Sequence, residues 1–251
     1  MYHTTGLERE RITDLCVLIE EGTDPEVQKW PPILGLFTAV VISLTYLRRN
    51  RVQQELAEAY GVSQATISRA ITVVTPLLGA ALRRFVPTAE EVDSKTHYIV
   101  DGTLLPCWSW ADHPQLYSGK HKTTGMNVQV VCTLDGAIAW ISDPIDGSRH
   151  DTYCLRDSAV MAEVEPGSWL GDKGYVGNDM LTPIKKPVGR DLLDWEREFN
   201  TQVNKIRYVV ERAIANLKTW RIIHTDYRRP LSTFASTIST VVGLYFYATA
   251  E

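Results

Sequence analysis

The chain has 251 residues, of which 44% are hydrophobic and 22% are charged. This length and composition exclude an intrinsically disordered chain and are typical of a globular protein with one large domain or two small ones. A net charge of -4 at pH 7 argues against a uniformly basic nucleic-acid-binding protein, although a chain average hides local patches.

Cysteine usage and hydropathy exclude further classes of protein. The four cysteines are far apart and form no C-x-x-C pair: Cys16, Cys107, Cys132 and Cys154. This spacing favours reduced thiols over a zinc site or a disulfide framework. No apolar run is long enough to span a bilayer, and the first eleven residues lack the apolar segment of a signal peptide. We therefore expect a cytoplasmic, nucleoid-associated protein with no membrane partner.

The first quarter of the chain is expected to be helical. Residues 7–20 favour a short helix, and apolar residues recur at helical spacing from Ile33 to Leu47. A further helix is expected to end between Pro76 and Gly79, before a polar linker that reaches Lys95. We therefore predict two domains, 1–88 and 89–251.

The stretch 52–71 has the pattern of two short helices joined by a tight turn. Leu56 would pack inward, Gly61 would supply the turn, and Ser63 would cap the second helix. The pattern resembles the helix-turn-helix of DNA-binding proteins, although a helical hairpin with an accidental glycine turn is the alternative. The resemblance implies that five residues face DNA: Gln64, Ala65, Thr66, Ser68 and Arg69.

Strand patterns follow the linker. His97–Val100 is a predicted strand that ends on Asp101. Met126–Cys132 and Ala137–Ile141 alternate in the manner of strands on either side of Asp135-Gly136, a strong hairpin signal. Asp135 is therefore interpreted as a turn residue.

Several polar and aromatic residues near the hairpin allow two readings each. Trp108 and Trp110 could stack on an unpaired base, although partial burial is the commoner role of tryptophan. His150 could orient a phosphate or simply pack, and Asp151 has the position of a helix cap. The basic loop 185–190 could be solvated or could follow a phosphate backbone.

Asp172 ends a short apolar run and is followed at once by a glycine-containing turn. A carboxylate at the end of a buried strand is costly to desolvate unless a cation lies beside it, so such residues are usually paired, capping or catalytic. Asp101 has the same setting. If both met Glu211, the three carboxylates would suit Mg²⁺ or Mn²⁺, which prefer hard oxygen ligands.

Glu211 lies in the predicted helix 192–218, whose apolar residues form one stripe. At about 100° per residue, Asn204, Arg207 and Lys218 fall on the same ridge as Glu211. Arg207 and Glu211 could form a solvated i,i+4 pair. Alternatively, Glu211 could bind a metal while Arg207 and Lys218 contact the DNA backbone.

The ordered set of acids resembles the DDE transposases, and most of all their insertion-sequence and Harbinger-like members. It comprises Val100–Thr103, Leu170–Tyr175 and a helix with Val210–Arg212 and a lysine seven positions after the glutamate. The resemblance implies a mixed α/β fold in which an RNase H-like five-stranded sheet with flanking helices follows a small all-α helix-turn-helix domain. Asn204 stands where the family usually has tyrosine, so no role is carried over for it.

The family also implies a chemistry and its partners. Asp101, Asp172 and Glu211 would hold two Mg²⁺ or Mn²⁺ ions about 4 Å apart, with Arg207 and Lys218 as further catalytic residues. The activity would be that of a DNA transposase, in which water frees a 3′-hydroxyl that then attacks target DNA. Partners would be terminal inverted repeats, target duplex and further copies of the chain in a homodimer or higher multimer. A regulator derived from a transposase and a non-joining endonuclease are the alternatives.

Overall fold

The computed structural model describes residues 2–24, 29–108, 112–162, 165 and 167–250. They fold into two compact units: a helical unit of Met1–Val86 with Lys218–Glu251, and a sheet unit of Pro87–Leu217. The first break is close to the predicted boundary, but the C-terminal segment joins the helical unit. The division into a DNA-binding domain of residues 1–88 and a catalytic domain of residues 89–251 stays a prediction.

The helical unit contains the helices expected from the apolar spacing. Its N-terminal part consists of α1 (Tyr2–Thr5), α2 (Arg9–Glu21), α3 (Gly35–Arg49), α4 (Gln53–Tyr60), α5 (Gln64–Leu82) and the 3-10 turn η1 (Arg83–Phe85). Its C-terminal part consists of the turns η5 (Arg221–Ile223) and η6 (Leu231–Thr233) and the helix α8 (Phe234–Thr249). The two helices predicted over 7–20 and 33–47 are confirmed as α2 and α3.

Helix α5 runs through Pro76, whereas the sequence predicted an end between Pro76 and Gly79. Proline removes one backbone donor and disfavours the interior of a helix. Packing of α8 along α5 offsets that cost: the Thr240 hydroxyl donates to the Thr75 carbonyl at 3.2 Å, and Leu82 at the end of α5 is fully buried. The C-terminal helix therefore covers α5.

The sheet unit is centred on its longest strand, β3 (Thr123–Thr133). The other strands are β1 (Tyr98–Pro106), β2 (Tyr117–Ser118), β4 (Ile138–Ile141) and β5 (Ile145–Asp146). Strand β3 pairs antiparallel with β1 along nearly its whole length and with β4 and β5 on its other side. The predicted hairpin is confirmed, with Gly136 at φ +97° in the turn between β3 and β4.

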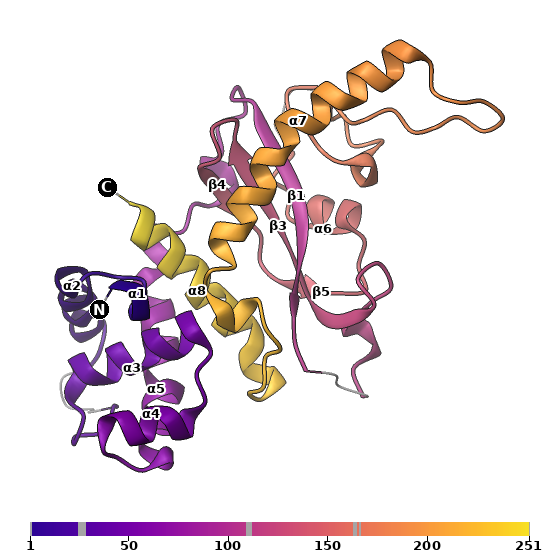
Figure 1. Cartoon of the computed structure of the whole chain (residues 1–251). Helices are drawn as coiled ribbons and strands as arrows, with labels where there is room; N and C mark the ends of the chain where they lie inside the picture. Colours follow the sequence, from indigo (N-terminus) through magenta and orange to yellow (C-terminus); the bar gives the residue numbers. More distant parts are fainter. Residues whose placement is uncertain (1, 25–28, 109–111, 163–164, 166, 251) are drawn as a thin grey trace. The chain divides into compact units, whose positions relative to one another are not determined.

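Helices cover both faces of this sheet (Figure 1). They are α6 (Asp151–Asp157) and α7 (Asp194–Leu217), with the 3-10 turns η2 (Ala89–Glu91), η3 (Pro114–Leu116) and η4 (Lys173–Tyr175) in the connections. Val100 packs in one apolar cluster with Leu155 of α6. Asp101, the next residue of β1, meets α7 instead. Side chains alternate along a strand, so one residue step in β1 separates the core from the α7 face.

The predicted fold class is confirmed as a mixed α/β protein with a five-stranded sheet and flanking helices after an N-terminal helix-turn-helix region. One element is shorter than expected. The segment before Asp172 forms single parallel bridges from Leu170 to Ile99 and to Leu181, not a full strand. All four cysteines are free thiols.

Among the described residues, two helical segments are long and apolar enough to cross a membrane by length and composition alone, Gln64–Glu91 and Leu231–Thr249. They contain α5 and α8, which pack against each other. Their apolar residues form the core of the unit, since Ile67, Ile71 and Val241 are fully buried.

We expect substitution of Gly243 in α8 to weaken the helical unit. A Cβ at this position would lie 2.9 Å from the Cβ of Leu82, which cannot swing away. Overpacking in Gly243→Val should lower the free energy of unfolding by about 1–3 kcal/mol, more than the helix regains by losing a glycine. Thermal and urea denaturation measure this change. Ala235→Val at an exposed position of the same helix is the control, and equal losses in both variants would contradict the packing argument.

Candidate active site

Asp101 lies in the middle of β1, opposite Val130 of β3. Its Oδ2 is 3.7 Å from a guanidinium nitrogen of Arg207 on α7, and the two side chains are only 19% and 15% exposed. Its Oδ1 accepts a hydrogen bond from the Gly102 amide at 3.0 Å. The carboxylate is therefore held between the sheet and α7, largely out of solvent.

The surroundings of Asp101 disfavour its charge. Burial raises the pKa of Asp101 to about 6, the Arg207 cation opposes that rise, and the carboxylates of Asp172 and Asp151 add to it. Asp101 therefore lies within electrostatic reach of two other acids. Carboxylates this close repel one another, and a bound cation would relieve that repulsion.

Asp172 lies at the start of the turn η4, where its Oδ1 accepts a hydrogen bond from the Gly174 amide at 2.6 Å. The bridges formed by Leu170 bring this turn to the edge of β1. Tyr175, three residues later, is fully buried. Backbone pairing and aromatic packing thus place Asp172 near Asp101, across 71 positions of sequence.

Asp151 is a third acid of this site that the sequence interpreted only as a helix cap. It is the first residue of α6, and His150 occupies the cap position. Its carboxylate accepts hydrogen bonds from Lys120 at 2.8 Å and from the Asn127 amide at 2.9 Å. Burial opposes its charge, but these two bonds outweigh burial and lower the pKa of Asp151.

Gly102 makes room for Asp151. A Cβ on Gly102 would lie 2.3 Å from a carboxylate oxygen of Asp151 and 2.9 Å from the amide nitrogen of Gln129. Strand alternation turns this position toward α6 while Asp101 points to α7. Asp101 therefore contacts α7 on one face of the sheet, and Gly102 makes room for α6 on the other. The sequence alone did not reveal this requirement for glycine.

A chain of hydrogen bonds connects Asp151 to the turn that carries Asp172. Asn127 accepts a hydrogen bond from Gln129 at 3.2 Å, and Gln129 accepts one from the Tyr175 hydroxyl at 2.5 Å. Burial and the nearby carboxylates raise the pKa of Tyr175, so the phenol stays a donor. Fully bonded buried polar groups of this kind fix a single arrangement.

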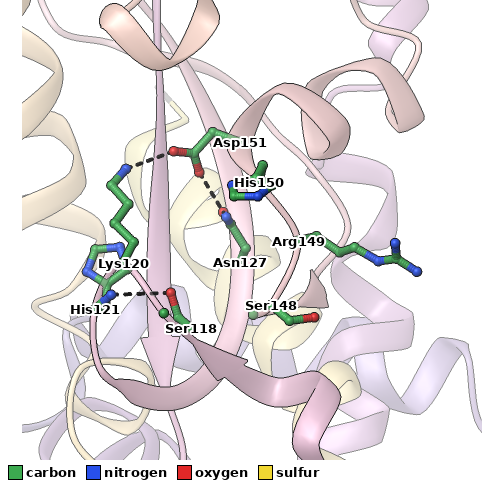
Figure 2. Close-up of a pocket in the computed structure, with 10 residues that line it drawn as sticks. Ser118, Lys120, His121, Asn127, Ser148, Arg149, His150 and Asp151 are labelled. Carbon is green, nitrogen blue, oxygen red and sulfur yellow. Dashed lines mark hydrogen bonds and ion pairs between the residues drawn. The ribbon is translucent and has the colours of Figure 1, made fainter.

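A cavity of about 260 Å³ lies beside Asp151, and Figure 2 shows the side chains that line it. The loop of Ser118–His121 forms one wall and the turn of Gly147–Asp151 forms the other. Burial opposes the charge of Lys120, but its bond to Asp151 and the three aspartates together raise the pKa of Lys120. A lysine that stays protonated therefore stands at the edge of the acid group.

Glu211 is exposed on α7, one helical turn beyond Arg207 and on the same side of the helix. Over the part of the chain that the structure describes, no three acidic, histidine or cysteine side chains gather closely enough to hold a metal ion. Asp172 and Asp151 are the acids that act on the charge of Asp101, and Glu211 is not among them. The donors are carboxylate oxygens only, a set that fits Mg²⁺ or Mn²⁺.

The two predicted catalytic cations lie in different units. Arg207 contacts Asp101, and its Nε is buried without a hydrogen-bond partner among the described residues. Such an unpaired donor suits an anion such as a phosphate oxygen. Lys218 directly follows α7 in the sequence, is half-buried and belongs to the helical unit.

The helix-turn-helix consists of α4 and α5, with Gly61 at φ +64° in the turn. Ser63 caps α5 by accepting from the Thr66 amide at 3.2 Å, as predicted. Gln64, Ala65 and Arg69 are exposed and Ser68 is half-buried. Thr66 is different: its side chain is buried and its hydroxyl contacts that of Ser63 at 2.9 Å, so the structure does not present it to DNA.

The remaining candidates divide between solvent and structural roles. Trp108 is 54% exposed, and Trp110 lies outside the described residues. In the basic loop, Arg190 forms two hydrogen bonds of 2.7 and 2.8 Å with Glu196 at the start of α7. These bonds lower the pKa of Glu196 to about 2, so at least this arginine of the loop has a structural partner.

Comparison with protein families gives two matches that together span residues 34–84 and 100–245. The first segment matches the helix-turn-helix of DDE superfamily endonuclease, and the second matches DDE superfamily endonuclease itself. The second match begins at the strand of Asp101 and includes Asp172, Glu211 and Lys218. No solved structure matches the chain.

Curated proteins with similar sequences include two transposases and a nuclease. A putative transposase for insertion sequence element IS112 from Streptomyces albus G is 30% identical, over 83% of this chain and 79% of the relative. A probable transposase for insertion sequence element IS702 from Microchaete diplosiphon is 24% identical, over 98% of this chain and 93% of the relative. The putative nuclease HARBI1 of Mus musculus is 23% identical, over 72% of this chain and 56% of the relative.

The raised pKa of Asp101 predicts a stability that falls with pH in metal-free buffer. The folded carboxyl titrates near 6 and an ordinary one near 3.8, so the cost of its charge is absent below pH 3.8 and complete above pH 6. Asp101→Asn removes that cost and should raise the free energy of unfolding at pH 7.5 by about 1–3 kcal/mol.

Urea denaturation of both proteins in a chelator at pH 4.5 and pH 7.5 measures this difference. The gain should shrink toward the lower pH. Asp143→Asn, at an exposed position of the same unit, controls for the loss of one charge. An Asp101→Asn protein less stable than the parent at pH 7.5 would show that the Arg207 pair, not desolvation, decides the balance.

Proposed function

The chain belongs to the DDE superfamily endonucleases, and from this membership we propose that it is a DNA transposase that cuts transposon ends and joins them to target DNA. The observation that carries the proposal is the convergence of Asp101 and Asp172, from separate segments, into one group of partly buried acids. The names of the two transposase relatives support the same activity.

In this proposal Asp101, Asp172 and Glu211 would hold two Mg²⁺ or Mn²⁺ ions. The ions would supply activation of the attacking oxygen and stabilisation of the leaving oxygen. Asp101 and Asp172 are already neighbours, because pairing of Leu170 with β1 fixes them. Glu211 would join by reorienting its exposed side chain on the same side of α7 as Arg207.

The cations near the acids would handle the phosphate. Arg207 offers a buried Nε donor that gains a partner when a phosphate oxygen arrives. Lys120 is held by Asp151 at the cavity edge and would orient the DNA backbone next to the reacting phosphate. Lys218 is proposed to contact the DNA backbone near the reacting centre. Each group would position substrate and spread transition-state charge.

The proposed reaction has two steps. Water attacks a phosphodiester at the transposon end, and the broken bond leaves a free 3′-hydroxyl on the element. That hydroxyl then attacks a phosphodiester of target DNA and displaces a new 3′-hydroxyl there. Two ends must meet for joining, so we propose that the chain acts as a homodimer or higher multimer on DNA.

The helix-turn-helix is proposed to bind the terminal inverted repeats. Gln64, Ala65 and Arg69 form an exposed row at the start of α5, and Ser68 lies beside them. These are the positions through which the second helix of such motifs meets the major groove. Thr66 would act as part of the helix cap. We place this activity in the cytoplasm, on the nucleoid.

Two specific observations favour other activities. The exposed Glu211 would suit a DNA-binding regulator whose acids no longer act together. The likeness to a putative nuclease would suit an enzyme that cuts without joining. An assay with uncut ends and a target duplex separates these from a transposase: we expect cut and joined products with Mg²⁺ or Mn²⁺. Cleavage without joining would identify the nuclease, and binding without either would identify the regulator.

Asp172→Asn should abolish strand cleavage of the protein's own inverted repeats in Mg²⁺. Loss of a residue that only supports a ligand costs about 10- to 100-fold, so loss of a ligand should cost more than about 100-fold. DNA affinity should be unchanged, because the helix-turn-helix lies elsewhere in the chain.

Gel analysis of end-labelled duplex measures cleavage, and fluorescence anisotropy measures binding. Asp179→Asn is the matched control, since it removes an exposed carboxylate from the same connection. Full cleavage by the Asp172→Asn protein would refute the carboxylate mechanism.

A further inference from the structure

Three arginines line an open cleft of the helical unit, just before the first helix of the helix-turn-helix. The cleft has a volume of about 490 Å³ and is lined by Arg49, Arg51, Arg221, Asn50, Glu55 and two smaller residues. Arg49 and Arg51 flank the turn between α3 and α4. Arg221 comes from the C-terminal segment, 170 positions further along the chain.

Buried contacts fix the C-terminal segment against this turn. Ile222 and Ile223 of η5 are fully buried. On either side of them, Arg48 donates to the Thr219 hydroxyl and Asn50 to the Thr225 hydroxyl, each at 2.6 Å. Arg221 itself is exposed. Arg48, Asn50 and the two isoleucines therefore anchor the segment, and the Arg221 side chain between these anchors lines the cleft.

The cleft carries a surplus of positive charge. Three arginines face one acid, Glu55, so the formal sum is 3 − 1 = +2. Arg51 is 3.5 Å from Glu55, but both side chains are more than half exposed, at 61% and 56%. Exposed pairs of this kind contribute little, so the pair would yield readily to a stronger anion.

The start of α4, where Val52 and Glu55 line the cleft, is hydrogen-bonded to the start of α5. Gln53, the first residue of α4, accepts a hydrogen bond from Gln64, the first residue of α5, at 2.7 Å. A second C-terminal cation approaches α5 directly, because Arg229 donates to the Thr72 hydroxyl at 2.8 Å. The C-terminal segment thus adds cations at two places along the motif.

We propose that this arginine cleft, formed by Arg49, Arg51 and Arg221, binds backbone phosphates of duplex DNA. The inference rests on the proposed DNA binding by the helix-turn-helix and extends that surface to the C-terminal segment. Guanidinium groups match phosphate oxygens in pairs, and phosphate contacts set the register of a reading helix. In such motifs the first helix crosses the DNA backbone, and the cleft lies at the start of this helix, α4.

The test is fluorescence anisotropy of the full chain with a duplex of its own inverted repeat, in chelator so that no cutting occurs. We expect Arg221→Gln and Arg51→Gln each to weaken binding several-fold at low salt. Each lost phosphate contact should also reduce the slope of log affinity against log salt by about 0.9. Arg221→Lys, which keeps the charge, should retain the slope and lose only part of the affinity.

Two further variants are controls, one expected to strengthen binding and one expected to leave it unchanged. Glu55→Gln removes the one acid of the cleft and should strengthen binding. Arg9→Gln removes an exposed arginine that packs on Phe37, outside the cleft, and should change neither affinity nor slope.

An unchanged salt slope in Arg221→Gln, with the parent protein binding normally, would overturn this inference alone. An equal loss in Arg9→Gln would overturn it as well, since the effect would then be one of total charge. Failure of the parent protein to bind the duplex would overturn the proposed DNA-binding function together with the cleft.

Discussion

The burial of Asp101 between β1 and α7 is the constraint on which the sheet unit depends. A carboxylate that is 19% exposed is costly to keep charged, and Arg207 at 3.7 Å offsets only part of that cost. The position of Asp101 on β1 is fixed, because β3 and Leu170 both pair with this strand and hold it in register. Such rigid placement of a carboxylate is what the proposed reaction would require of it.

The third acid of the group, Asp151, occupies the space that a side chain at position 102 would fill, directly after Asp101 in β1. Glycine leaves the space that the Asp151 carboxylate occupies, and Asp151 in turn holds Lys120. The hydrogen bonds from Asn127 through Gln129 to Tyr175 extend this arrangement to the turn of Asp172. The two faces of one strand therefore cooperate: one presents the carboxylate, and the other fixes the elements around it.

In the helical unit, the two ends of the chain form one structure. Helix α8 covers α5, and η5 seals the end of α3 with two buried isoleucines. The proposed duplex-binding surface is therefore built from N-terminal and C-terminal residues, as the arginine cleft illustrates. The C-terminal segment therefore both stabilises α5, through α8, and contributes Arg221 to the arginine cleft.

Sequence by itself determined the local elements, because periodicity and turn residues are local signals. It gave α3 and α7 from their apolar stripes, the β3–β4 hairpin from Asp135-Gly136, and the capped turn at Ser63. The ordered acids Asp101, Asp172 and Glu211 indicated the family, which the family match bears out. Residue-level roles at the site stay predictions.

Only the tertiary structure decided which distant groups meet. Asp151 as a neighbour of Asp101, the buried side chain of Thr66, the course of α5 through Pro76 and the packing of α8 on α5 each depend on contacts between segments far apart in sequence. The physical reason is that burial and electrostatics act through space. A pattern of residues reveals which face of an element is apolar, but not which partner covers it.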